Sequence, residues 1–97
     1  MNNDELNWNE TPQAAVQRWF ELPTAESEEW ATIKKMLADE INRLIKNDFE
    51  KLLHILYRID VNEQQAMEAL SKADAAELLT ELIIERQLQK VESRKRN

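Results

Sequence analysis

Hydrophobic residues recur at spacings of three and four along most of the chain, which is the periodicity of amphipathic helices. The clearest run places Trp30, Ile33, Leu37, Ile41 and Leu44 on one side of a helix. A chain of 97 residues has the length of one domain. We therefore predict a single all-α domain over residues 1–97, with 1–10 and 93–97 as less ordered ends. The predicted fold is a compact bundle of about five helices, at approximately 12–21, 25–46, 48–59, 63–72 and 75–94.

Capping residues indicate where these helices begin. Thr11 precedes Pro12, a pair typical of the N-cap and first position of a helix. A capping box, in which a polar cap is followed three residues later by Glu or Gln, is expected at three further sites. The boxes are Asn47 with Glu50, Asn62 with Gln65, and Asp74 with Glu77. Thr24 is expected to cap the second helix, and Pro23 to end the first.

The junction between the second and third helices is open to two interpretations. At about 100° per residue, the apolar face formed by Phe49, Leu52, Leu53 and Leu56 lies roughly 100° away from that of residues 30–44. This change of phase favours a break at 46–48. The alternative is one curved helix of about 35 residues. In the predicted bundle the second and fifth helices form the walls, and the third is the most buried element.

The fifth predicted helix changes its apolar face midway. Leu78, Leu79, Leu82 and Ile83 share one face, whereas Ile84, Leu88 and Val91 form a second stripe on roughly the opposite side. Two explanations remain open. The N-terminal helices could cover the second stripe within the monomer, or the stripe could form an interface with a partner. Ile84, Leu88 and Val91 are therefore the candidate partner interface.

The composition removes most enzyme classes. The chain contains no glycine, so Walker loops, dinucleotide-binding fingerprints and nucleophile elbows are excluded. It contains no cysteine, and its single histidine, His54, falls on the polar side of the third predicted helix. These features indicate no catalytic residue, no metal ligand set, no cofactor and no small-molecule substrate. The chain is expected not to be an enzyme.

The charge is negative overall but basic at the C-terminal end. The formal net charge is −6, which argues against nucleic-acid binding because phosphates repel an acidic protein. Arg94, Lys95 and Arg96 nevertheless form a basic end and are the candidate contact for an anionic partner. Glu77, Glu81 and Glu85 form a ladder that is either a solvated face or a partner for basic side chains of another helix or another subunit. No apolar run is long enough to span a membrane, and a cytoplasmic location is expected.

The segments LYRID (Leu56 to Asp60) and LIIERQLQK (Leu82 to Lys90) resemble a group of short, uncharacterised bacterial helical proteins. The likeness covers about the C-terminal half of the chain and carries no activity with it. It implies a structural role for Arg58, Asp60, Arg86 and Gln87. Arg58, Asp60 and Arg86 are the candidate ion-pair residues between the third and fifth helices.

Together these features favour a non-enzymatic protein–protein interaction or assembly module, and a homodimer is one form that it could take. The second apolar stripe, the acidic first half with its basic end, and the missing chemistry all point to a protein partner or self-association. The alternative is a nucleic-acid-associated regulator that uses the basic C-terminal end.

Overall fold

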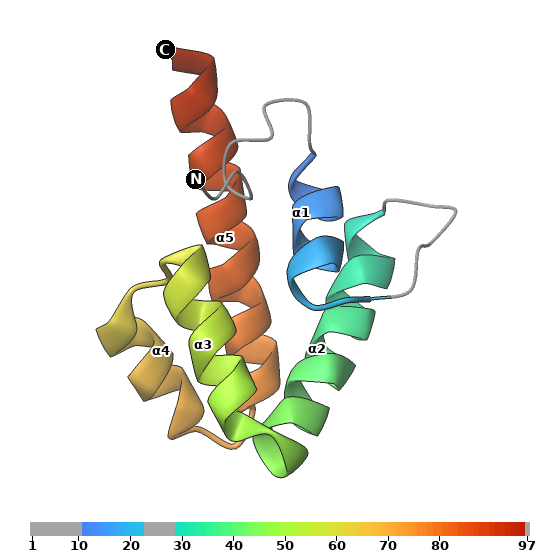
Figure 1. The fold of residues 1–97 in the computed structure, drawn as a ribbon, viewed down its shortest axis with the longest axis vertical. Coiled ribbons are helices and arrows are strands. Elements are labelled where there is room, and N and C mark those ends of the chain that lie inside the picture. Colours follow the sequence, from blue (N-terminus) through green and yellow to red (C-terminus); the bar gives the residue numbers. More distant parts are fainter. Residues whose placement is uncertain (1–10, 23–28, 97) are drawn as a thin grey trace.

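The computed structural model describes residues 11–22 and 29–96, and every regular element in these two ranges is an α-helix (Figure 1). The prediction of an all-α bundle is confirmed. Among the described residues, no helix combines the length and the apolar character that crossing a bilayer requires. The helices within the described ranges are α1 (Pro12–Trp19), α2 (Trp30–Asn47), α3 (Phe49–Ile59), α4 (Glu63–Leu70) and α5 (Ala75–Arg96).

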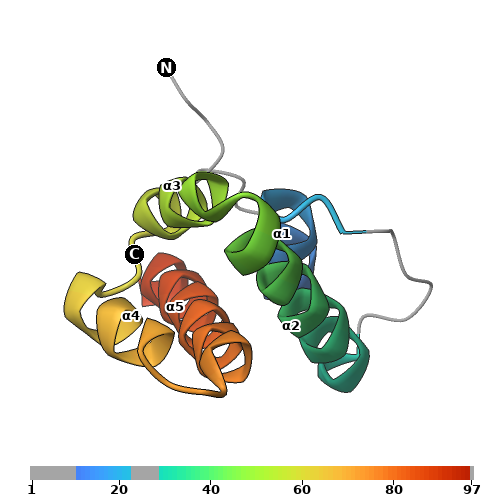
Figure 2. The ribbon, with the colours of Figure 1, turned by 90° about the horizontal axis from the view of Figure 1, so that it is seen from below.

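The last helix, α5, is the centre of the bundle. It packs against each of the other four helices. Figure 1 shows α1 and α2 on one side of it and α3 and α4 on the other. The third helix had been expected to be the most buried element, and it buries four of its eleven residues, a larger share than α1, α2 or α4. α3 packs against α2 and α5 only along one side, and it lies at the edge of the bundle (Figure 2).

The core is built from apolar residues at helical spacing on α2, α3 and α5, closed by α1. The predicted face of α2 is confirmed, because Ile33, Leu37, Ile41 and Leu44 are all fully buried. Burying one such side chain contributes about 1.5–3 kcal/mol relative to leaving it in water. The other fully buried side chains come from the remaining helices of the core: Val16, Leu52, Ile59, Leu79 and Ile83.

The capping signals located three helix starts correctly, those of α1, α4 and α5, and misplaced two others. Thr11 Oγ1 accepts a hydrogen bond from the Ala14 amide at 3.1 Å, and Asn62 Oδ1 accepts one from the Gln65 amide at 2.9 Å. The predicted break between α2 and α3 is present, but Asp48 rather than Asn47 caps α3 through the Lys51 amide. Asn47 instead ends α2 and donates its amide to the Arg43 carbonyl.

The predicted start of the second helix at residue 25 is too early. Glu29 has an extended backbone, with φ −66° and ψ 134°, so the helix cannot run through it and begins at Trp30. The predicted cap Thr24, the predicted helix-ending Pro23 and the predicted less ordered end at 1–10 lie outside the described residues. The fifth helix continues to Arg96, beyond the predicted end at 94, whereas α4 ends at Leu70, two residues early.

Two helices end in left-handed residues although the chain has no glycine. Glu21 (φ 53°) follows α1, and Asp60 (φ 69°) follows α3. In each case the backbone amide of the following residue donates a hydrogen bond to a carbonyl five residues earlier. Leu22 N donates to Gln17 O at 2.9 Å, and Val61 N donates to Leu56 O at 3.2 Å. These are Schellman motifs, which usually place glycine at the left-handed position. Aspartate tolerates this conformation better than glutamate does.

Replacing Glu21 with glycine is therefore expected to stabilise the protein. The Cβ atom at a left-handed position costs about 1 kcal/mol or more, partly offset by the greater freedom of glycine in the unfolded chain. The lost ion pair with Lys51 (3.2 Å) is exposed and contributes little. We expect a gain of about 0.5–1 kcal/mol in the free energy of urea unfolding. Glu21→Ala, which keeps the Cβ atom, should give no gain; equal gains from both variants would contradict the explanation.

Candidate protein-interaction surface

The predicted second stripe of α5 is divided between the core and the surface. Ile84 is only 5% exposed and belongs to the same core cluster as Val16 of α1 and Phe20, the residue that follows α1. Leu88, one turn further on, is 46% exposed, and Val91 is half-buried. Ile84 is therefore not available to a partner, and only the Leu88 end of this stripe reaches the surface.

Of the three candidate ion-pair residues, Arg86 and Asp60 meet. Arg86 Nη2 lies 3.1 Å from Asp60 Oδ2, and Arg86 Nε donates to the Asp60 backbone carbonyl at 3.1 Å. The guanidinium thus links α5 to the left-handed residue that ends α3. The carboxylate is 77% exposed, so the attraction is screened by solvent and its contribution is modest.

Arg58 has a different neighbour. Its guanidinium lies 5.4 Å from the centre of the Trp19 ring, and Arg18 approaches the same ring at 5.0 Å. Such cation–π contacts are favourable for arginine over an indole. Arg58 therefore connects α3 to α1, while Arg86 connects α3 to α5. These two arginines thus link α3, at the edge of the bundle, to α1 and to α5.

The carboxylate ladder and the basic end are only partly described. Glu81 pairs with Lys34 of α2 at 3.4 Å, so one step of the ladder does meet a basic side chain of another helix. Glu77 and Glu85 are exposed. The backbone of α5 runs helically to Arg96, but the side chains of Arg94, Lys95 and Arg96 lie outside the described residues.

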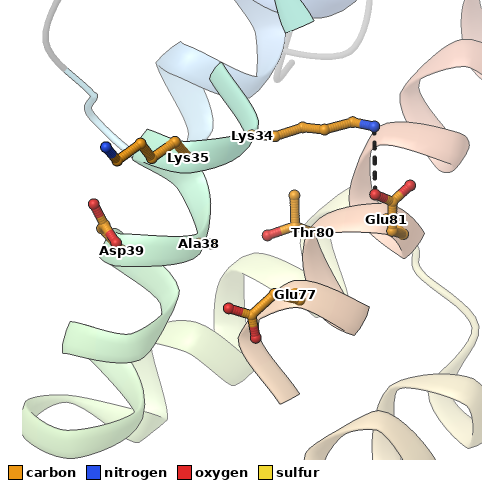
Figure 3. A pocket seen from close by; sticks show the side chains of 7 residues that line it. All are labelled: Lys34, Lys35, Ala38, Asp39, Glu77, Thr80 and Glu81. Atoms are coloured by element: carbon orange, nitrogen blue, oxygen red, sulfur yellow. Dashed lines mark ion pairs between the residues drawn. The ribbon is translucent and has the colours of Figure 1, made fainter. Parts of the chain in front are cut away.

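A shallow cleft of about 340 Å³ separates α2 from α5 (Figure 3). The Lys34–Glu81 ion pair crosses it, and Lys35, Asp39 and Glu77 line its sides. The Thr80 hydroxyl at its floor is buried and donates to the Ala76 carbonyl at 2.8 Å. Among the described residues, no group of three or more potential ligands could hold a metal ion. The cleft is shallow and its charged side chains pair with one another or are hydrated, so it does not enclose a small ligand.

One carboxylate has a displaced pKa, and its cause is local. The pKa of Glu40 lies below its ordinary value because Arg43, three residues later on α2, donates a hydrogen bond to it (Nε–Oε1 2.9 Å). A lowered pKa keeps the carboxylate ionised and makes it a weaker base. This pair is therefore a local ion pair within α2.

The unexpected feature of the surface is an apolar face on α3. Phe49 is 42%, Leu53 41% and Tyr57 84% exposed. Because these residues are spaced by four, they fall within an arc of about 80° along the outer side of the helix. Phe49 and Leu53 had been assigned to the core-facing side, which is wrong. The buried side of α3 is instead formed by Leu52, Ile55, Leu56 and Ile59.

A signal for this face was present in the sequence. Seven of the eleven residues of α3 are large and apolar, and they cover an arc of about 200° around the helix. A helix at the edge of a small bundle buries roughly half of that arc. The excess apolar arc therefore indicated an exposed face, although it did not say which part would be exposed. His54, the only histidine of the chain, borders this face and is exposed as expected.

Exposed apolar side chains are also found singly on other helices. Met67 on α4 is 62% exposed and Leu88 on α5 is 46% exposed. Isolated side chains of this kind are normal on protein surfaces, whereas three in line on one helix are a candidate contact face. We call Phe49, Leu53 and Tyr57 the α3 face.

No protein-family model, curated protein or solved structure matches this chain.

Proposed function

We propose that this chain is a non-enzymatic protein–protein interaction module that assembles through the α3 face. The observation that carries the proposal is the exposure of Phe49, Leu53 and Tyr57 in one line along a helix at the edge of the bundle. Folding alone does not require these side chains, because α3 is anchored by a separate buried side and by two arginine contacts.

The size and composition of the α3 face support a contact with another protein. A buried Phe or Tyr covers about 150–250 Å², so the exposed parts of the three side chains amount to roughly 300 Å². Patches of this size on small proteins are often functional. Tyrosine is also enriched at the centres of interfaces, since it offers a large apolar ring together with a polar hydroxyl.

Site-specific photocrosslinking in cells tests this proposal. With p-benzoylphenylalanine in place of Tyr57, irradiation should give a discrete protein adduct, because the side chain lies within the contact. The same residue in place of Asn42, which is exposed on α2, provides the matched control. Adding Leu53→Glu should remove the Tyr57 adduct by placing a charge in the middle of the face. The proposal fails if Tyr57 gives no more adduct than Asn42, or if Leu53→Glu leaves the adduct unchanged.

A further inference from the structure

We infer that the partner of the α3 face is a second copy of this chain, docked antiparallel so that the two Leu53 side chains meet on a two-fold axis. The inference rests on the proposed function and names its partner. It follows from the order of the side chains along α3, from the charges at the two ends of this helix, and from its position in the bundle.

The α3 face is self-complementary when one copy is turned end to end. Phe49 lies four residues before Leu53, and Tyr57 lies four residues after it. About an axis through Leu53, each Phe49 therefore faces the Tyr57 of the second copy, and the smaller leucines fill the centre. Two-fold dimers need this property, since the same patch must fit itself. Aromatic rings paired at both ends would pack edge-to-face or offset.

The charges along α3 favour the antiparallel orientation. Asp48 and Glu50 lie at the N-terminal end, where Lys51 is paired with Glu21. Arg58 lies in the last turn, where Asp60 is paired with Arg86, so the charges do not cancel at either end. In an antiparallel pair, each acidic end approaches the basic end of the other copy. A parallel pair would bring the two acidic ends together and align the two helix dipoles unfavourably.

The position of α3 leaves room for a second molecule but limits the contact area. α3 packs on α2 and α5 through its opposite side and runs along an edge of the molecule (Figure 2). The roughly 300 Å² of the α3 face is less than the roughly 800 Å² per partner of a standard stable interface. We therefore expect a weak dimer, with a dissociation constant in the micromolar range or above.

Single cysteines provide a direct test, because the chain has none of its own. Under mild oxidation, Leu53→Cys should form a reducible disulfide-linked dimer, since the two residues meet on the axis. Phe49→Cys and Tyr57→Cys should each stay monomeric alone, because equivalent residues lie about 12 Å apart along the helix, beyond the roughly 7 Å that a disulfide can bridge. A mixture of these two variants should give the mixed dimer. Met67→Cys, exposed on α4, provides the background rate.

The outcomes separate this inference from the proposed function. Equal cross-linking of all three single variants would overturn the antiparallel geometry. Cross-linking of Leu53→Cys no faster than Met67→Cys would overturn the second copy as the partner. In that case, a Tyr57 photoadduct with a different protein would leave the proposed function standing, whereas no adduct would end both.

Far-UV circular dichroism of each variant checks that it is folded. Sedimentation should show the wild-type mass rising with concentration and the Leu53→Glu mass staying monomeric.

Discussion

Replacing Ile84 with glutamate is expected to unfold the protein, whereas the same substitution at Leu88, one turn further along α5, should be tolerated. Ile84 is 5% exposed and lies in the core cluster, while Leu88 is 46% exposed. A carboxylate at position 84 would be buried without a partner, which costs several kcal/mol. A domain of this size has about 5–15 kcal/mol of stability in total, so a loss of about 5 kcal/mol or more unfolds a domain at the lower end of this range. Leu88→Glu should change the stability by less than about 1 kcal/mol.

Urea unfolding followed by far-UV circular dichroism measures this difference. Ile84→Val is the matched control, because it removes one methylene group from the same site and should cost about 0.5–1.5 kcal/mol. If Ile84→Glu were folded with nearly wild-type stability, Ile84 would be accessible and could belong to an interface after all. If Leu88→Glu were as damaging as Ile84→Glu, the C-terminal half of α5 would be buried beyond what its exposure indicates.

The parts of the fold that depend on local interactions were predictable from the sequence. Thr11 and Asn62 cap their helices through amides three residues later, so both signals lie within one turn of the chain. The face of α2 was also predictable, because its apolar residues form one narrow stripe that can only point inward. The extended conformation of Glu29 had no comparable local signal, and the start of α2 was therefore placed too early.

The orientation of α3 could not be predicted because its sequence is compatible with several rotations. Apolar residues cover about 200° of the helix, and any half of this arc could have faced the core. The contacts that decide between them come from far along the chain. Arg86 binds the end of α3 at Asp60, 26 residues earlier, and Arg58 lies over Trp19 of α1. These contacts favour burial of Ile55 and Ile59 and leave Phe49 and Leu53 at the surface.

The absence of glycine excluded several enzyme motifs but did not exclude left-handed backbone. Glu21 and Asp60 both adopt it, because the Schellman hydrogen bonds and the apolar residue that follows each of them offset the steric cost. Composition thus states which residues are missing. Composition does not predict where packing will place a residue other than glycine in a left-handed conformation.

Replacing the buried Gln87 with an apolar residue is expected to raise the stability of the protein. It is 5% exposed in the middle of α5, and its Nε2 amide nitrogen is buried with no hydrogen-bond partner. An unsatisfied buried donor costs about 1–3 kcal/mol. Methionine has nearly the same length and flexibility and needs no hydrogen bond. Gln87→Met is therefore expected to raise the free energy of urea unfolding by about 1–2 kcal/mol.

The control is Gln64→Met on α4, where the side chain is exposed and the change should stay within about 0.5 kcal/mol. A loss of stability in Gln87→Met would mean that the Gln87 amide is hydrogen-bonded in solution. The simplest partner would be a buried water that accepts its hydrogen bond. Gln87 was expected to have a structural role, and a gain and a loss of stability would give that role opposite meanings. A gain would mark a polar group that the core tolerates at a cost, whereas a loss would mark one that holds α5 in place.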